Sequence, residues 1–371
     1  MGIHPDFPFD LAEVLAGTEP DRPVYLFSPA ALIRTFRQFE TAFSGEVTFA
    51  VKANPERHVL RTLCQAGMRA FDVASVDEMR AVRAVCPEAR LHYHNPVRSA
   101  AEIAAAKRFG ITSWSIDRIS ELDKLGEIMG QEIAVRIKLP VKGAAYDFGS
   151  KFGAEPELAQ ALLRAVEGRG ARASITFHPG TQCDDPEPWR RYIAAAAEIA
   201  EAAGIKLERL NVGGGFAANR GVAPDLQAVF AAIETAVAAS FGRGAPKLVC
   251  EPGRAMVSES FTLVLGVKAL CEEGVFLSDG LYGALMEWRD LPAPERITAL
   301  DPDGMPRSGP RAPRVVFGPT CDSLDRLPEP LPLPQDLAAG DRLVIRGMGA
   351  YSLCLATGFN GYGRAQVVVT G

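Results

Sequence analysis

The chain has 371 residues, of which 47% are hydrophobic and 23% charged, and its formal net charge is -5 at pH 7. This length exceeds what one hydrophobic core usually organises, so we expect an ordinary globular protein of two domains. The acidic balance and the lack of a basic stripe argue against a nucleic-acid partner or an anionic membrane surface, and favour small-molecule chemistry.

The sequence gives no sign of a targeting or membrane segment. Residues 1–17 lack a basic region followed by an apolar one, and nowhere do eighteen uncharged apolar residues run together. We therefore expect a cytoplasmic protein with no membrane partner. The seven cysteines are odd in number, scattered and never in CxxC spacing, so we expect reduced thiols, no disulfide framework and no metal.

Short apolar runs alternate with Ala-, Leu- and Glu-rich stretches over the first two thirds of the chain, which is typical of parallel strands joined by helices. The candidate strands are 47–53, 68–75, 90–96, 112–117, 132–139, 173–179, 209–216 and 247–254. Apolar residues at helical spacing predict helices over 75–85, 99–110 and 187–204. Eight strands with crossover helices predict a (β/α)8 TIM-like barrel of the α/β class over 25–254.

The pattern changes after Arg254 to short strands separated by proline-rich turns, without long helices between them. The candidate strands of this part are 260–270, 314–318, 342–346 and 365–371, and the segment 327–336 has the composition of a turn. We predict a mostly β C-terminal domain over 255–371. The pattern leaves open to which domain residues 1–24 belong.

Polar residues stand at or just after the carboxyl end of nearly every proposed barrel strand. They are Lys52, Asp72, Ser75, Asn95, Asp117, Arg136, His178, Gly213 to Gly215, Glu251 and Arg254. Any one of them could have no functional role, since each strand ends in a loop and loops are usually polar. In a barrel, however, these ends form the active-site face, and the coincidence over eight strands favours a site there.

Three of these strand ends suggest a particular chemistry. Lys52 follows an apolar strand, where desolvation would lower the pKa of its amine and free it to attack a carbonyl. The glycines 213–215 follow another strand, where backbone N-H groups can surround a phosphate, although a tight structural turn is an equally good explanation. The next strand adds Arg254 for the charge of that phosphate and Glu251 as an acid.

Other residues allow more than one interpretation. His178 could be a base, but no second histidine or carboxylate stands at metal-ligand spacing, and stacking on a cofactor is as good a use of its ring. In the β domain the loop 318–327 combines Cys321 with two carboxylates, and the segment 349–363 places aromatic residues among glycines. Cys321 alone could equally be a small buried hydrophobe.

Together these motifs resemble the fold-type III pyridoxal-phosphate (PLP) decarboxylases, the group that contains ornithine, arginine and diaminopimelate decarboxylases. The resemblance covers nearly the whole chain. It rests on ten motifs in order: FAVKANP, FDVAS, HNPVRS, SKFGA, FHPGTQC, NVGGGF, EPGR, DGLYG, FGPTCDSLDRL and FNGYG. The resemblance implies PLP as the cofactor, a homodimer with shared active sites, and decarboxylation of an amino acid.

The resemblance also implies roles for individual residues. Lys52 resembles the lysine that holds PLP covalently, Glu251 the carboxylate that keeps the pyridine nitrogen protonated, and Cys321 the acid that protonates the α-carbon. The residues that resemble the rest of the cofactor site are Asp72, Glu78, Arg136, His178, Thr181, Gly213, Gly214, Gly215, Arg254 and Tyr351. In such dimers the loop with Cys321 is supplied by the partner subunit, and Lys151 and Asp325 match a pair that bridges the subunits.

The residue after Cys321 bears on the substrate. In diaminopimelate decarboxylases this loop resembles the sequence CES, with a glutamate after the cysteine. This chain has Asp322 at that position, and its carboxylate can bind the distal ammonium of a substrate. Candidates for further substrate contacts are Tyr282, Glu287, Asp290 and Phe359, with Arg289 as an unexpected positive charge beside two of them. We expect a basic L-amino acid, with L-ornithine first and L-lysine or L-arginine as alternatives, because one methylene changes affinity by only about 1–3 kcal/mol.

Three other readings are weaker. Alanine racemases share the barrel and the lysine but use an arginine at the ring nitrogen, which Glu251 contradicts. A non-catalytic homologue resembling antizyme inhibitor would have lost cofactor residues that this chain retains, such as Lys52 and Arg254. A PLP-homeostasis protein of the same barrel would lack the β domain.

Overall fold

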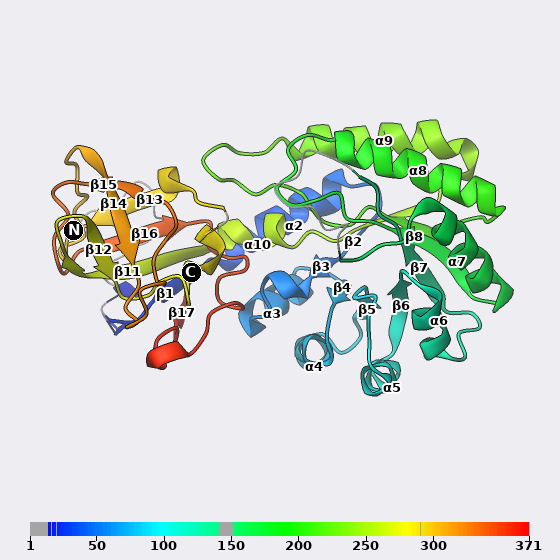
Figure 1. Cartoon of the computed structure of the whole chain (residues 1–371), viewed down its shortest axis with the longest axis horizontal. Coiled ribbons are helices and arrows are strands. Elements are labelled where there is room, and N and C mark those ends of the chain that lie inside the picture. Colours follow the sequence, from blue (N-terminus) through cyan, green and yellow to red (C-terminus); the bar gives the residue numbers. More distant parts are fainter. Residues whose placement is uncertain (1–13, 16, 20, 141–150, 290, 371) are drawn as a thin grey trace. The chain divides into compact units, whose positions relative to one another are not determined.

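The computed structural model describes residues 14–15, 17–19, 21–140, 151–289 and 291–370. These residues form two compact units (Figure 1). The barrel unit lies within Ile33–Ala217 and Pro224–Met256, and the β unit within Met1–Leu32, Ala218–Ala223 and Val257–Gly371.

The barrel unit contains the eight strands that the sequence predicts, so the TIM-like architecture is confirmed. Within the described residues its sheet has the order β2-β10-β9-β8-β7-β6-β5-β4-β3, with every pair parallel. The strands are β2 (Glu46–Val47), β3 (Phe49–Ala50), β4 (Ala70–Val73), β5 (Arg90–Tyr93), β6 (Ile111–Ile116), β7 (Glu132–Arg136), β8 (Arg172–Thr176), β9 (Arg209–Asn211) and β10 (Lys247–Cys250).

The first predicted strand closes the barrel because its two halves pair with different neighbours. β2 pairs with β10, whereas β3 pairs with β4 on the other side. Thr48, between the halves, donates from its backbone N-H and its hydroxyl to the Cys250 carbonyl at 2.9 and 3.0 Å. One strand therefore joins the last strand of the barrel to the second, and brings Lys52 to the same end as Glu251.

Figure 1 shows the helices of the barrel unit on the outside of its strands. The helices are α2 (Pro29–Ala42), α3 (Arg57–Gln65), α4 (Val76–Val85), α5 (Ala100–Arg108), α6 (Ile119–Leu125), α7 (Pro156–Gly168), α8 (Glu187–Ala203), α9 (Leu226–Phe241) and α10 (Arg254–Val257). The three helices predicted from the sequence are confirmed as α4, α5 and α8. Ser99 caps α5 in a capping box with Glu102, and Gly204 ends α8 in the left-handed conformation.

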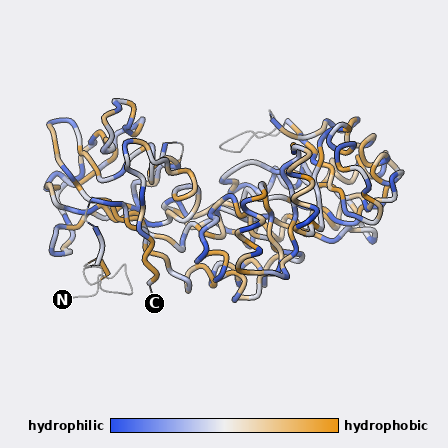
Figure 2. The backbone as a smooth tube through the Cα atoms, turned by 90° about the horizontal axis from the view of Figure 1, so that it is seen from below, coloured by the Kyte–Doolittle hydropathy of each residue, from blue (hydrophilic) through white to orange (hydrophobic). Residues whose placement is uncertain are grey.

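The barrel and its helices bury a continuous apolar core, and Figure 2 shows hydrophobic segments through the barrel unit. One aromatic cluster joins α2, α8 and α9: the rings of Phe39, Phe216 and Phe230 lie 5.3–5.6 Å apart, and Trp189 stacks on Phe216 at 5.1 Å. Burial of each such ring stabilises the fold by roughly 2–3 kcal/mol. The long α8 and α9 thereby fix the β9 end of the barrel.

The β unit is an eight-stranded sheet within the described residues. Its path is β13-β16-β11-β12-β14-β15, with β1 between β11 and β17. The strands are β1 (Val24–Phe27), β11 (Phe261–Leu270), β12 (Gly274–Leu277), β13 (Ile297–Leu300), β14 (Arg311–Phe317), β15 (Leu331–Pro334), β16 (Arg342–Arg346) and β17 (Gln366–Val369). A small apolar core around Leu26, Val264 and Val344 packs against this sheet.

Two predictions about the β unit are wrong. Residues 25–27 were placed in the barrel, but β1 pairs with β11 and β17 in the β unit, because its four buried residues fit between those strands. The proline-rich segment 327–336 was interpreted as a turn, but it contains β15. Pro332 and Pro334 are tolerated there because β15 is an edge strand.

Two of the cysteines form a pair that the sequence did not predict. Cys64 in α3 and Cys86 after α4 are disulfide-bonded, with Cα atoms 6.0 Å apart. The expectation that all thiols are reduced is therefore wrong for this pair. Its members are 22 residues apart without CxxC spacing, so only the packing of α3 against α4 brings them together.

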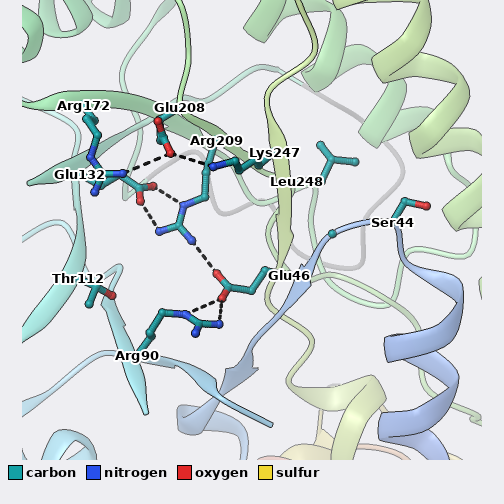
Figure 3. A pocket seen from close by; sticks show the side chains of 11 residues that line it. Ser44, Glu46, Arg90, Thr112, Glu132, Arg172, Glu208, Arg209, Lys247 and Leu248 are labelled. Atoms are coloured by element: carbon teal, nitrogen blue, oxygen red, sulfur yellow. Dashed lines mark hydrogen bonds and ion pairs between the residues drawn. The ribbon is translucent and has the colours of Figure 1, made fainter. Parts of the chain in front are cut away.

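A cavity of 620 Å³ opens at the amino ends of the barrel strands, opposite the predicted site (Figure 3). Charged residues line it in ion pairs: Glu46 with Arg90 and Arg209, Glu132 with Arg209, and Glu208 with Arg172 and Lys247. This ion-pair cluster closes the floor of the barrel. Residues at this face usually contribute to stability, not to catalysis.

No helix among the described residues has the length and apolar content needed to cross a membrane.

Candidate active site

The residues predicted for the site fall into two groups. Those in the barrel unit are Lys52, Asp72, Glu78, Arg136, His178, Thr181, Gly213, Gly214, Gly215, Glu251 and Arg254. Those in the β unit are Tyr282, Glu287, Cys321, Asp322, Tyr351 and Phe359. Asp290 lies outside the described residues.

Glu251 lies at the centre of a buried hydrogen-bonded cluster just after β10. Its Oε1 accepts a hydrogen bond from Asn211 Nδ2 and lies at hydrogen-bond distance from His94 Nδ1, both at 2.5 Å. Burial alone would raise the pKa of Glu251, but His94, Lys52 and Asn211 together lower it to about 2. Glu251 is therefore an ionised carboxylate at neutral pH.

His94 is buried on the other side of this contact. Its second ring nitrogen, Nε2, lies 3.0 Å from the Ser113 hydroxyl on β6. Burial lowers the pKa of an imidazole, but the Glu251 carboxylate outweighs it, and the pKa of His94 is raised above its ordinary value. His94 and Glu251 therefore form an ion pair inside the barrel.

Asp72 is a buried carboxylate on β4 close to this pair. One polar atom from each of Asp72, His94 and Glu251 lies within 4.8 Å of the others. Burial, followed by the charge of Glu251, raises the pKa of Asp72 to about 7. Its Oδ1 has no hydrogen-bond partner among the described residues. A buried acceptor left in this state is costly, so the site is built to receive a polar group.

His178 and Arg136 come from the ends of adjacent strands. His178 follows β8, and its Nδ1 accepts a hydrogen bond from Gly180 N at 3.2 Å. Burial, together with the charges of Lys52 and Arg136, lowers the pKa of His178 to about 3. His178 is therefore a neutral ring at neutral pH. Arg136 ends β7, with its guanidinium 5.2 Å from the centre of the Phe152 ring.

Lys52 lies in the 3-10 turn Val51–Ala53 that follows β3. Its charge lowers the pKa values of Asp72, Glu78 and Glu251, so its ammonium is near all three. The prediction that its side chain is desolvated is wrong for the single chain, because Lys52 is exposed. Glu78, in the first turn of α4, accepts a hydrogen bond from Ala74 N at 2.6 Å, and Ser75 caps this helix.

The glycine loop 213–215 needs glycine because the backbone of neighbouring strands comes close to it. A Cβ at Gly213 would lie 2.1 Å from Phe177 O, and at Gly214 2.8 Å from Glu251 O. Gly213 and Gly215 also have φ of +69° and +87°. The loop is therefore a backbone surface without side chains, as anion binding by N-H groups requires.

Thr181 and Arg254 border this glycine loop. The loop that holds Thr181 is tied to it by a hydrogen bond from Cys183 N to Gly215 O at 2.9 Å. Arg254 is the first residue of α10. A hydroxyl, a guanidinium and backbone N-H groups are the kinds of donor that bind a phosphate.

The β unit assembles most of its predicted site residues in a second group. Tyr282 donates its hydroxyl to Asp322 Oδ2 at 2.7 Å, and the Tyr282 ring lies 5.5 Å from that of Phe359. Cys321 is exposed, with its Sγ 3.3 Å from Asn360 Oδ1. This loop is held from behind by buried Asp325, which accepts hydrogen bonds from Leu281 N and from the Thr320 backbone and hydroxyl.

Glu287 does not join this group. Its carboxylate is buried and pairs with Arg220 at 2.8 Å, so the prediction that it binds a substrate is not supported by its position. Tyr351 has a left-handed backbone, with φ of +52°. A tyrosine held in that conformation is strained, which is common at binding sites.

Sequence reasoning missed the partners of Glu251. His94 and Asn211 belong to quoted motifs, HNPVRS and NVGGGF, but neither was named as a site residue. Both face the barrel interior, where an apolar residue is the usual occupant. A polar residue in the interior register of a strand is the signal that could have identified them.

Comparison with known proteins places this site in a family. Residues 30–258 match the family model described as the pyridoxal-binding domain of pyridoxal-dependent decarboxylases. The chain is 32% identical over 339 residues to ornithine decarboxylase 2 of Drosophila melanogaster, covering 85% of this chain and 83% of the relative. It is 31% identical over 335 residues to the lysine/ornithine decarboxylase of Selenomonas ruminantium, covering 87% and 83%.

A solved structure agrees with this placement. The arginine decarboxylase of Paramecium bursaria Chlorella virus, bound to agmatine, matches with a TM-score of 0.83 and 26% sequence identity. The match covers 94% of this chain and 97% of that protein.

Proposed function

The chain belongs to the pyridoxal-dependent decarboxylases that act on basic amino acids, and from this premise we propose that it converts L-ornithine to putrescine and CO2. The observation that carries the proposal is the barrel site, in which an ionised Glu251, the glycine loop and Lys52 stand at the ends of neighbouring strands. L-Lysine and L-arginine are the alternatives, because relatives that use each of them match this chain.

The residues present fit PLP. The glycine loop carries no side chains and is hydrogen-bonded to the two segments that hold Thr181 and Arg254, which suits the phosphate. Glu251 and the orphaned Oδ1 of Asp72 provide acceptors for the ring nitrogen and its surroundings. Bound PLP supplies an electron sink for the electrons released when CO2 leaves the α-carbon.

The side chains of this unit then have distinct tasks. Lys52 would hold the cofactor through its amine. Glu251, as an ionised acceptor, keeps a proton on the ring nitrogen. His178 is neutral, so its ring can lie against the cofactor without adding a charge. Arg136 contributes a half-buried positive charge to the same site.

The second group of residues supplies the proton and the substrate contact in this proposal. Cys321 returns a proton to the α-carbon after CO2 has left, and the Asn360 amide oxygen beside its Sγ orients the thiol. Asp322 binds the distal ammonium of the substrate, with Tyr282 fixing its carboxylate. Glu287 is paired with Arg220, so we assign this contact to Asp322, which follows Cys321 and is bonded to Tyr282.

The proposal includes a homodimer in which the Cys321 loop of one subunit completes the barrel site of its partner. Mixing two inactive variants, Lys52→Ala and Cys321→Ala, tests this arrangement. If the site is shared, heterodimers regain one intact site of their two, and mixed samples recover up to about a quarter of wild-type activity. No recovery in a sample with proven subunit exchange would refute the shared site.

The substrate is tested with purified, PLP-reconstituted protein. We would incubate it separately with L-ornithine, L-lysine, L-arginine and meso-diaminopimelate, measure CO2 release and identify the amine by mass spectrometry. Putrescine as the preferred product supports the proposal. Cadaverine or agmatine as the preferred product would refute ornithine as the substrate and keep the reaction class.

A further inference from the structure

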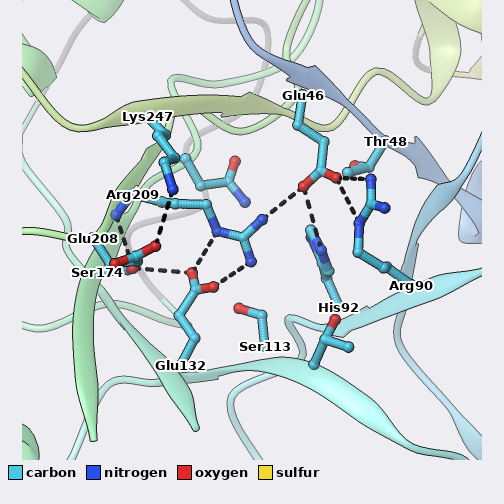
Figure 4. A network of polar contacts seen from close by, with 12 residues as sticks. Glu46, Thr48, Arg90, His92, Ser113, Glu132, Ser174, Glu208, Arg209 and Lys247 are labelled. Atoms are coloured by element: carbon cyan, nitrogen blue, oxygen red, sulfur yellow. Dashed lines mark hydrogen bonds and ion pairs between the residues drawn. The ribbon is translucent and has the colours of Figure 1, made fainter. Parts of the chain in front are cut away.

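The contact between His94 and Glu251 joins the cofactor site to the inside of the barrel. His94 follows β5, and alternation along the strand places its ring on the interior side together with that of His92. The two rings lie 5.6 Å apart, yet only His94 reaches Glu251. His92 instead faces the ion-pair cluster, with its Nε2 3.6 Å from a Glu46 oxygen (Figure 4).

The hydrogen bonds around Glu251 settle which atoms donate. Asn211 Oδ1 accepts from Gly213 N at 2.9 Å, so the amide nitrogen of Asn211 must point toward Glu251. The ionised carboxylate of Glu251 can only accept, so Nδ1 of His94 donates to it. Both donors reach the same oxygen, Oε1. Among the described residues the other oxygen of Glu251 has no such donor, so it can accept a hydrogen bond from a further group.

The charges around His94 favour its protonated form. The carboxylates that act on it are Glu251 on one side, Asp72 from β4 and Glu132 from β7. Its other polar neighbours are neutral: the Asn211 amide, the Ser113 hydroxyl, and His92, whose pKa is lowered by burial and then by His94 itself. The carboxylates therefore balance the charge of the His94 imidazolium, and His92 does not add a second positive charge beside it.

We propose that His94 is a positioning residue that keeps the proton of the Glu251-cofactor contact on the ring nitrogen of PLP. The inference rests on the proposed function. A proton shared between two groups stays on the more basic one. His94 and Asn211 hold Glu251 as a fixed anion of low proton affinity, so the ring nitrogen keeps the proton and the cofactor remains a strong electron sink.

Removal of the imidazolium should reverse this balance. Without His94, burial raises the proton affinity of Glu251, and the proton moves from the ring nitrogen toward the carboxylate. We expect the affinity for PLP to fall by about tenfold, the effect of one lost charge-assisted hydrogen bond. The decarboxylation rate should fall in the same variant.

The test measures the ring nitrogen directly. Wild-type, His94→Gln and His92→Gln proteins are reconstituted with PLP labelled with nitrogen-15 at the ring, and the resonance is compared with that of free PLP at low and high pH. His92 is the matched control, because it is an equally buried histidine without a contact to Glu251. We expect a protonated ring nitrogen in wild type and His92→Gln, and a shift toward the unprotonated position in His94→Gln.

Two outcomes would overturn the inference: an unshifted resonance in His94→Gln, or an equal shift in both variants. If His94→Gln does not fold, Ser113→Ala, which keeps the imidazole and removes only its Nε2 partner, should give a smaller shift in the same direction, and no shift there also refutes the role. Failure of the proposed function has a different signature, since the wild-type protein would then not bind PLP or release CO2 from any basic amino acid.

Discussion

The glycine loop offers a sharp test of the site, because the same substitution can be made where it meets atoms and where it does not. At Gly213, φ is +69° and a Cβ would lie 2.1 Å from Phe177 O, about 0.9 Å short of the 3.0 Å below which real Cβ contacts essentially do not occur. At Gly204, which ends α8, φ is +72° and a Cβ would have nothing within 4 Å.

Alanine would therefore meet the same backbone strain at Gly213 and Gly204, and the two positions differ only in the clash of the Cβ with neighbouring atoms. Alanine in the left-handed region costs about 1 kcal/mol at either position. At Gly213 the ends of β8 and β9 must also separate, which adds about 1–3 kcal/mol as overpacking does elsewhere. We expect Gly204→Ala to lower the free energy of unfolding by about 1 kcal/mol with PLP affinity unchanged, and Gly213→Ala to lower it by about 2–4 kcal/mol.

Urea unfolding of the apoprotein, followed by circular dichroism, gives the two stabilities, and titration with PLP followed by absorbance gives the affinities. Gly213→Ala should also bind PLP much more weakly, since the displaced loop no longer presents its backbone to the phosphate. Equal stabilities and equal affinities for the two variants would refute the reasoning, because they would mean that the close approach to Phe177 does not constrain the loop.

Three further predictions concern other parts of the chain. The pKa of His178 is about 3 in the folded chain against an ordinary value of 6.5, so the unfolded apoprotein binds a proton there first, and stability is lost as pH falls from about 7 to about 3. In urea unfolding, His178→Phe should reduce this loss by at most about 1.4 kcal/mol per pH unit. An unchanged slope would contradict the assignment. Asp322→Asn should raise KM for the preferred substrate by about tenfold or more in a CO2-release assay, with no change in thermal unfolding, and an unchanged KM would remove Asp322 from the substrate contact. The pairing of Cys64 with Cys86 predicts that the protein, denatured under non-reducing conditions, titrates five thiols and not seven, and seven would show the pair reduced.

The barrel could be predicted from the sequence because its signals are local. Each strand is a short apolar run, and each crossover helix has apolar residues at helical spacing and a polar cap, so the pattern does not depend on distant partners. β1 and β15 were misplaced because their pairing is not local. β1 finds its neighbours more than 230 residues away, at β11 and β17, and β15 is allowed its prolines only by its place at an edge.

The site shows the same division between local and non-local signals. Lys52, Gly213 and Glu251 could be named because the end of a barrel strand is a functional position whatever the rest of the fold does. The exposure and the ion pairs of the site residues could not be predicted from the sequence. The exposure of Lys52 in the single chain and the pairing of Glu287 with Arg220 depend on how separate segments pack, which no residue spacing records.

His94 illustrates why the missing information matters for chemistry. From the sequence alone, Glu251 is a buried acid, and burial would make it a better base and a poorer anion. The barrel closes so that β5 and β9 carry His94 and Asn211 to the same oxygen of Glu251, and these contacts reverse the sign of the shift. The family resemblance implies which acid meets the cofactor, but the pKa of that acid depends on Lys52 and on two interior residues, His94 and Asn211, that become its neighbours only after the strands have paired.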